Sequence, residues 1–204
     1  MLNELENLIK FIQIEYTDLS DKWEESNYYA KINWKNTLVY ELLENEKALN
    51  IIFNYREFIN ENNIKLVMDF KQFNTDIAKV NIRAKLRNSI EFKIKNYILN
   101  HENGEIPINK CLNDLFGIRI ICKKEISNTQ INELIKNKFP NLKCIDSSKK
   151  DYKATHIYFK KDNFSFPWEL QIWNEINEKN NIYSHEKYKQ DYVRWEKESK
   201  GGAK

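Results

Sequence analysis

The stretch D-L-F-G-I-R-I-I-C, Asp114 to Cys122, decides the fold of this chain. Its apolar part, Gly117 to Cys122, predicts a buried β-strand with a carboxylate shortly before it. Downstream, the patterns predict strands at Asp151 to Phe159 and Phe166 to Trp173, with a helix at Asn128 to Phe139 before them. Helices and strands therefore alternate. This order favours an α/β (α+β) fold, in which a mixed sheet is flanked by helices.

Upstream of this stretch, residues 80–85 alternate between apolar and polar side chains. Side chains two apart on a strand share a face, so this pattern predicts a strand with cationic side chains along one face. A helix that Asn88 or Ser89 caps, and that carries Lys93, is predicted to follow. The sequence thus places basic groups close to the carboxylate of Asp114.

The two ends of the chain have helical patterns. Apolar residues recur at spacings of three and four in residues 5–16 and 38–53, which predicts two amphipathic helices. A long polar helix is predicted from Glu175 to about Glu198. The expected plan is a helical extension packed on the core (1–70), a catalytic domain (71–198) and a tail (199–204).

Composition narrows the class of protein. The chain has 204 residues, of which 33 are basic and 30 acidic, and the net charge of +3 does not indicate a general polyanion binder. Any nucleic-acid site must therefore be a local patch. The sequence has no apolar run of membrane-spanning length, and its first 16 residues are too acidic for a signal peptide, so we expect a cytoplasmic protein without a membrane partner. Cys111, Cys122 and Cys144 are expected to be buried free thiols.

A polar face is predicted on two neighbouring strands. Tyr152 and His156 share one face of their predicted strand, and Glu169 and Gln171 share one face of theirs. The other face of the second strand carries apolar side chains only. For a single strand, a solvated sheet face would be the simpler interpretation. Two such strands beside a third, basic one favour a lined cleft.

The cleft would hold cations, two carboxylates and an aromatic side chain. These are the parts that phosphoryl-type transfer from a nucleotide requires, so the chain is predicted to be an enzyme. Taken singly, each residue has a structural alternative. Asp114 could be a helix-end carboxylate, Tyr152 a half-buried strand aromatic, His156 a satisfied sheet histidine, and the lysines solvated charges.

Four motifs together resemble a known family. They are R-A-K-L-R-N-S-I-E-F-K from Arg83, D-L-F-G-I-R from Asp114, Y-K-A-T-H from Tyr152 and E-L-Q-I from Glu169. They are similar to the synthetase domain shared by RelA/SpoT enzymes and small alarmone synthetases, with its R-x-K-x-x-x-S-I-x-x-K and D-h-x-G-h-R patterns, where h is apolar. The resemblance covers about residues 80–192. It implies the nucleotidyltransferase-like fold of that domain and transfer of the β,γ-pyrophosphate of ATP to a ribose 3′-hydroxyl.

The resemblance also implies roles on the ATP side. Arg83 and Arg119 would sandwich the adenine, because guanidinium planes stack on aromatic rings. Asp114 would bind Mg²⁺, with Glu169 either sharing the metal or accepting the proton of the attacking hydroxyl. The remaining ATP-binding residues would be Lys85, Ser89 and Lys93.

On the acceptor side, Tyr152 would stack on a base, and His156 and Gln171 would position the acceptor. Tyr152 and His156 would thus act with Asp114 and Glu169 in catalysis. His185, Tyr188 and Lys189 resemble the closing H-x-x-Y-K motif of the family and would contact phosphates.

The departures from the family pattern fall on the acceptor side. The loop before Tyr152 is contracted, with Asp151 where the family has glycine, and Trp173 and Asn174 alter the end of the E-x-Q-I-R-T motif. A-T-H-I-Y-F resembles the toxic branch of small alarmone synthetases, some of which pyrophosphorylate the 3′-CCA end of tRNA. A basic cluster could bind tRNA phosphates or, alternatively, protect the edge of a hairpin; it comprises Lys149, Lys150, Lys153, Lys160 and Lys161.

Other assignments remain open. The acceptor could instead be GDP or GTP, or ADP or ATP, which would make the chain an ordinary alarmone synthetase. A catalytically inactive module that binds nucleotide or RNA is a further alternative. No histidine is followed by aspartate, so the hydrolase signature of the family is absent. The short C-terminal part leads us to expect a monomer or a complex with an antitoxin protein.

Overall fold

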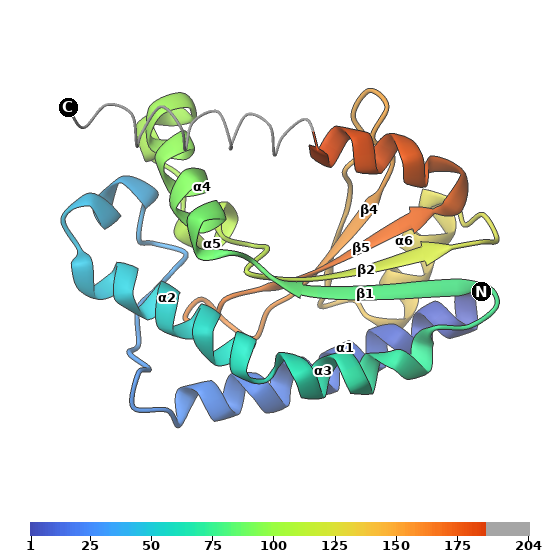
Figure 1. Cartoon of the computed structure of the whole chain (residues 1–204), viewed down its shortest axis with the longest axis horizontal. Coiled ribbons are helices and arrows are strands. Elements are labelled where there is room, and N and C mark those ends of the chain that lie inside the picture. Colours follow the sequence, from blue (N-terminus) through green and yellow to red (C-terminus); the bar gives the residue numbers. More distant parts are fainter. Residues whose placement is uncertain (187–204) are drawn as a thin grey trace.

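The computed structural model describes residues 1–186 of the chain, and its centre is a five-stranded sheet (Figure 1). The strand order is β1-β2-β5-β4-β3. β2 and β5 are parallel, and the other neighbours are antiparallel. The predicted mixed sheet flanked by helices is thus confirmed. The strands are β1 (Ala78–Ala84), β2 (Phe116–Cys122), β3 (Lys143–Asp146), β4 (Thr155–Phe159) and β5 (Trp168–Asn174).

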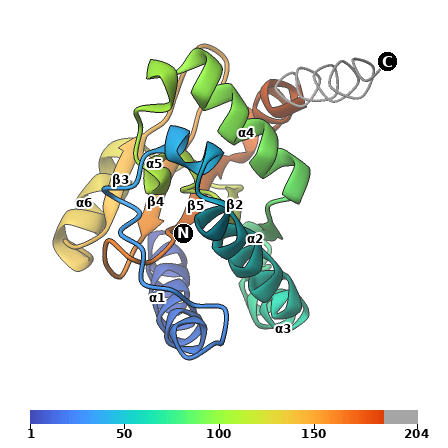
Figure 2. The same cartoon turned by 90° about the vertical axis from the view of Figure 1, so that its left-hand side faces the viewer.

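Helices surround the sheet (Figure 2). In Figure 1, α1 and α3 run below the strands, while α4 and the helical residues 178–186 lie above them. Among the described residues, no helix is both long and apolar enough to cross a membrane. The labelled α-helices are α1 (Leu2–Glu24), α2 (Glu46–Glu61), α3 (Asn63–Phe70), α4 (Arg87–Asn100), α5 (Ile108–Cys111) and α6 (Asn128–Lys138).

The apolar face of the sheet is the centre of the core. Trp168, Leu170 and Ile172 alternate along β5 and are all buried. Tyr16 of α1 packs edge-on against Trp168, with ring centroids 5.4 Å apart, and its hydroxyl donates to the carbonyl of Phe166. Each such apolar side chain contributes about 1.5–3 kcal/mol when it is removed from water. One continuous hydrophobic cluster therefore joins the N-terminal helices to the sheet.

The first predicted N-terminal helix is confirmed, and the second is divided. A short 3₁₀ helix, Val39–Leu43, ends before α2 begins at Glu46. The side chain of Asn45 accepts a hydrogen bond from the Ala48 amide and caps α2. Asparagine is a strong N-cap, so it starts a new helix within a continuous apolar pattern.

Two local predictions were wrong. Neither Asn88 nor Ser89 caps α4, because the helix begins at Arg87 with the extended residue Leu86 as its N-cap. The position of the chain is fixed just before this point, where the amide of Lys85 donates to the carbonyl of Leu115. The strand predicted from Asp151 begins only at Thr155, since a turn occupies the preceding residues.

The sequence also missed β3, a short edge strand that pairs with β4. It carries the half-buried Cys144. The other two thiols, Cys111 and Cys122, are buried and free, and burial raises the pKa of both to about 12. The expectation of free thiols is confirmed for all three cysteines, although Cys144 is not fully buried.

Candidate active site

A cleft of about 510 Å³ lies over the polar face of the sheet, between α4 and the helical residues 178–186. Ten of the residues predicted from the sequence line it: Arg83, Lys85, Ser89, Lys93, Asp114, Lys149, His156, Glu169, Gln171 and His185. The cleft is completed by residues that the sequence analysis did not name: Phe92, Asn96, Tyr97, His101 and Asn113.

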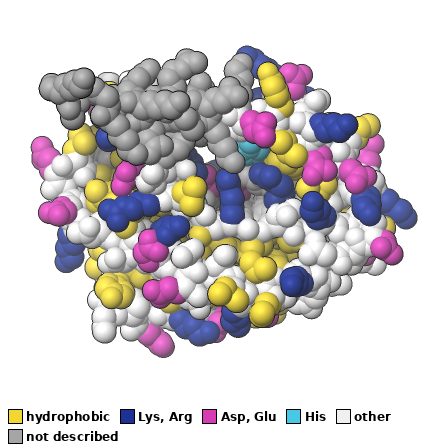
Figure 3. All heavy atoms as spheres, in the orientation of Figure 1, with side chains coloured by type: hydrophobic (Ala, Val, Ile, Leu, Met, Phe, Trp, Pro, Cys, Tyr) yellow, Lys and Arg dark blue, Asp and Glu magenta, His cyan; other side chains and the backbone are white. Residues whose placement is uncertain are grey.

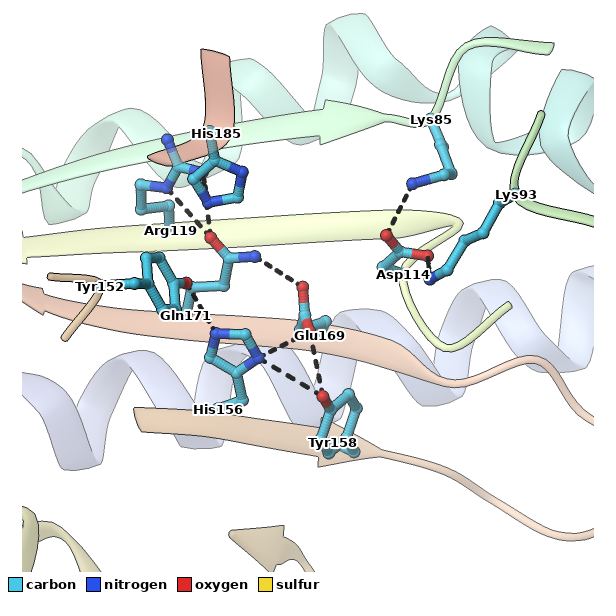
Figure 4. A network of polar contacts seen from close by, with 10 residues as sticks. All are labelled: Lys85, Lys93, Asp114, Arg119, Tyr152, His156, Tyr158, Glu169, Gln171 and His185. Carbon is cyan, nitrogen blue, oxygen red and sulfur yellow. Dashed lines mark hydrogen bonds and ion pairs between the residues drawn. The ribbon is translucent and has the colours of Figure 1, made fainter. Parts of the chain in front are cut away.

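Asp114 pairs with two lysines at one end of the cleft (Figure 4). Lys85 Nζ lies 2.7 Å from Oδ2 and Lys93 Nζ lies 2.9 Å from Oδ1. The antiparallel pairing of β1 with β2 brings Lys85, just past the end of β1, to Asp114, just before β2. Burial alone would raise the pKa of Asp114, but the charges of Lys93 and Lys85 outweigh it and hold the pKa below its usual range. The three side chains form a mostly buried cluster with an excess positive charge.

Glu169 is the centre of a second cluster, on β5. Tyr158 donates its hydroxyl to Oε1 at 3.1 Å, and Gln171 Nε2 donates to Oε2 at 2.7 Å. His156 Nδ1 lies 2.9 Å from Oε1. Burial opposes ionisation, but the hydrogen bond from His156 outweighs it, so the pKa of Glu169 is lowered. A buried carboxylate therefore stays ionised because polar groups of two adjacent strands surround it.

Tyr152 joins this cluster from a turn. Lys149 and Tyr152 exchange two backbone hydrogen bonds of 2.9 and 3.0 Å, and Lys150 between them has a φ of 52°. That left-handed conformation is uncommon for a residue other than glycine. The turn places the Tyr152 hydroxyl 2.9 Å from His156 Nε2, and burial raises the pKa of Tyr152 to about 12. Tyr152 and His156 thus meet as predicted, although not as neighbours on one strand.

Arg119 lies at the other end of the polar network from Asp114 and lines a small cavity beside the cleft (Figure 4). Its Nε and Nη2 both donate to Gln171 Oε1, at 3.1 and 3.0 Å. The guanidinium carbon lies 3.6 Å from the centroid of the Trp173 ring. Burial and the charge of Arg83 lower the pKa of Arg119 to about 10, which leaves it a cation at neutral pH.

The helical residues 178–186 are fixed to the Tyr152 turn by Asn181. The side chain of Asn181 is fully buried, accepts from the Lys153 amide at 2.8 Å and donates to the Lys153 carbonyl at 2.9 Å. This anchor places His185 against Trp173 and Arg119. Lys189 and Tyr188 lie outside the described residues.

The basic cluster expected around β4 is divided in the structure. Lys149 lines the cleft, and Lys153 lines a separate cavity of about 200 Å³. Lys160 donates to Asn163, and Lys161 pairs with the acidic side chains of α1, at the opposite end of β4. Basic and acidic side chains are interspersed on the face in Figure 3 where it is not grey. A nucleic-acid patch at the cleft would therefore consist of Lys149 and the adjacent Lys150, with Lys153 beside it.

Comparisons with known proteins find remote structural similarity and no sequence match. No protein-family model matches the chain, and no curated protein matches its sequence. The fold is similar to that of small alarmone synthetase 1 from Bacillus subtilis bound to its product pppGpp, at 19% identity and a TM-score of 0.42, over 76% of this chain and 91% of that chain. Small alarmone synthetase 2 from Bacillus subtilis matches at 17% identity and a TM-score of 0.39, over 74% of this chain and 82% of that chain. A GTP pyrophosphokinase family protein from Streptococcus pneumoniae matches at 18% identity and a TM-score of 0.41, over 74% of this chain and 78% of that chain.

Besides the cleft residues that it did not name, sequence reasoning gave no role in the site to Tyr158, Trp173 or Asn181. Tyr158 donates to Glu169, Trp173 lies under Arg119, and Asn181 holds the helix that carries His185. Strand periodicity could have found the first two, because Tyr158 shares a face with His156, and Trp173 shares one with Glu169. Nothing in the local pattern distinguishes Asn181 from the other asparagines of this Asn-rich chain.

The placement of His185 predicts an unusual titration. Burial, and the charges of Arg119 and Arg83, lower its pKa from 6.5 to about 4. Because the folded-state pKa is the lower one, the stabilising contribution of the neutral ring is complete above pH 6.5 and is lost as the pH falls towards 4. NMR titration, with the signal assigned by its loss in His185→Asn, should show a midpoint near 4. A midpoint near 6.5 would mean that His185 does not pack against Trp173.

Proposed function

We propose that the chain is an ATP-dependent pyrophosphokinase that modifies the 3′-CCA end of tRNA and thereby inhibits translation. The ribose 3′-oxygen attacks the β-phosphorus of ATP, and a new P–O bond forms. The bond between the β-phosphorus and the oxygen of the α-phosphate breaks, and AMP leaves. The hydroxyl proton passes to a base in the cleft. The observation that carries the proposal is the presence of the Asp114 and Glu169 clusters in one cleft.

The Asp114 cluster supports the proposed use of ATP as the pyrophosphate donor. Lys85 and Lys93 bring two positive charges to one carboxylate, so the cluster can attract the polyphosphate of a nucleotide. Arg83 lines the same cleft, and Arg119 lines a small cavity beside it that also contains Arg83 and Asp114. Transfer at phosphorus depends mainly on positioning and charge stabilisation, which these cations would supply.

The donor set suits Mg²⁺ that is bound together with ATP. Among residues 1–186, no group of three or more His, Cys, Asp or Glu side chains could hold a metal. Asp114 and Glu169 are nevertheless two carboxylates in one cavity, and Mg²⁺ commonly uses one or two carboxylates together with substrate phosphates and water. The ion would neutralise charge that develops on the transferred group. Asp114 and Glu169 would hold it, once phosphates draw Lys85 or Lys93 away from Asp114.

The Glu169 cluster supports activation of the acceptor. Glu169 is ionised and can accept the proton of a hydroxyl that reaches it in the cleft. His156 and Gln171 fix the two oxygens of this carboxylate, while Tyr152 orients the ring of His156. We assign the alignment of the ribose to these four side chains.

The Tyr152 turn supports a polymeric acceptor. The turn brings Lys149 to the cleft and leaves Lys150 exposed next to it. With Lys153, these lysines can contact the phosphates of an RNA end whose terminal base stacks on Tyr152. The proposal includes a cytoplasmic monomer, neutralised by an antitoxin partner.

Labelling of tRNA tests this proposal. With γ-labelled ATP and Mg²⁺, the protein is offered deacylated tRNA, GDP, GTP and ADP in parallel, and label is expected on tRNA. The double variant Lys149→Ala/Lys150→Ala should lower the salt dependence of tRNA modification by about one unit of log–log slope per lysine, with ATP binding retained. Lys160→Ala, at the other end of β4, is the matched control.

Other outcomes of this assay would select the alternatives. Label on GDP or GTP, or on ADP, would make the chain an alarmone synthetase of guanosine or adenosine nucleotides. ATP binding without transfer to any acceptor would favour an inactive nucleotide- or RNA-binding module. Unchanged tRNA modification in the double-lysine variant would remove the lysines of the turn from the proposal.

A further inference from the structure

Trp173 is an apolar side chain on a mostly polar face of the sheet. It alternates with Glu169 and Gln171 along β5, so all three point to the same side of the sheet. It is 0% exposed, and its indole Nε1 has no hydrogen-bond partner among the described residues. A buried N–H group without a partner is unfavourable. One contact of the indole ring is especially close.

Arg119 provides that contact. Its guanidinium carbon lies 3.6 Å from the ring centroid of Trp173, well within the range of a cation–π interaction. The two donor contacts to Gln171 Oε1 hold the guanidinium from its edge. The indole supports it from one face. Together these contacts fix both the position and the plane of the cation.

Two further rings enclose the indole. His185 stacks on Trp173 with centroids 5.5 Å apart and an interplanar angle of 28°. Tyr152 meets the indole edge-on, at 6.0 Å and 87°. His185 Nε2 also lies 3.4 Å from Arg119 Nη2. Arg119 thus contacts His185 as well as Gln171, and Figure 4 shows both contacts.

These contacts limit which face of the Arg119 guanidinium a ligand can use. Because the indole covers one face, a ligand ring can stack only on the opposite face. Arg119 and Arg83 line the same small cavity, of about 60 Å³, which also contains Asp114 and Glu169. A ligand that suits this arrangement has a flat aromatic ring joined to phosphates, and purine nucleotides have this chemistry.

We propose that Trp173 is a positioning residue that holds Arg119 as a flat plate for the purine base of the bound nucleotide. The choice of ATP as that nucleotide rests on the proposed function. Trp173 itself does not touch the ligand, because Arg119 and His185 cover it. Its effect should therefore appear in recognition of the base and not in recognition of the phosphates, which the Lys85 and Lys93 side chains would bind.

Calorimetric titration of the full chain with ATP and with inorganic tripolyphosphate separates recognition of the base from recognition of the phosphates. Trp173→Leu should weaken ATP binding about tenfold, as expected for loss of a desolvated cation–π contact, and leave tripolyphosphate binding unchanged. Trp173→Phe keeps an aromatic face and should restore most of the affinity. Ile121→Val is the matched control, because Ile121 packs in the same small apolar cluster without contributing a ring.

Each result decides the inference. Selective loss of ATP affinity in Trp173→Leu, with rescue by Trp173→Phe, supports it even if no acceptor is ever modified, in which case only the proposed transfer fails. Equal weakening of both ligands, or an equal effect of Ile121→Val, would overturn it and indicate general damage to the fold. Unchanged ATP affinity in Trp173→Leu would also overturn it. A wild-type protein that binds no ATP would overturn both the proposed function and this inference.

Discussion

Replacement of Asp114 by Asn is expected to reduce pyrophosphate transfer by about 10²–10³-fold, because the variant loses the charge that organises the donor side. The carboxylate contacts Lys85 and Lys93 at 2.7 and 2.9 Å, and its side chain is 16% exposed. An amide can accept from one lysine but presents its NH₂ group to the other. Two mostly buried cations would then face each other without a neutralising charge, and a carboxylate suited to Mg²⁺ would be lost.

The same substitution should also lower the free energy of unfolding. Removal of one partner from a buried ion pair costs about 3–5 kcal/mol, and partial exposure places this site at the lower end. The pKa of Asp114 is lowered in the folded state, so its contribution is complete above the unfolded carboxyl pKa of about 3.9 and is lost as the pH falls below that value. The destabilisation in Asp114→Asn should therefore be present at pH 7 and shrink in acid.

Transfer assays and chemical denaturation at pH 7 measure the two effects of Asp114→Asn. Asp146→Asn is the matched control, since it removes an exposed carboxylate on β3 that accepts a hydrogen bond from the nearby Ser148 amide. Wild-type transfer in Asp114→Asn would contradict the assignment of the donor side. Loss of stability with normal transfer would reduce the cluster to a structural ion pair.

The sequence predicts those parts of this fold that local periodicity determines. The alternation at Glu169 and Gln171 predicts a polar face opposite a buried apolar one, and the structure confirms both faces. The order of strands and helices predicts a mixed sheet. The contact between Lys85 and Asp114 also follows, because the ends of two adjacent strands must meet.

Tertiary contacts determine the remainder. Tyr152 reaches His156 through a turn with a left-handed Lys150, and neither strand periodicity nor propensity predicts such a conformation. Lys161 is close in sequence to the other lysines, yet its partners Asp21 and Glu24 are in α1, some 140 residues away. From the sequence alone, Trp173 resembles an ordinary core residue, and only the structure shows its contact with Arg119.

Replacement of Glu169 by Gln is the second large effect that we expect, a loss of about 10²–10⁴-fold in transfer with ATP binding preserved. The carboxylate is 5% exposed and accepts from Tyr158 and Gln171, with His156 Nδ1 at 2.9 Å. A glutamine has one acceptor oxygen where the glutamate has two, so one of these donors loses its partner.

Glu169→Gln therefore removes the proposed base and disturbs the side chains that orient the acceptor, whereas the donor cations at Asp114 are left intact. Single-turnover transfer and ATP titration should separate these consequences. Glu175→Gln, an exposed carboxylate just past the end of β5, should behave as the wild type. Tyr158→Phe removes one donor to Glu169 and keeps the charge, so its loss of transfer should be much smaller than that of Glu169→Gln. If the two variants lost equal activity, the hydrogen-bonded geometry of Glu169 would matter more than its charge, and proton transfer would have to be assigned to another group.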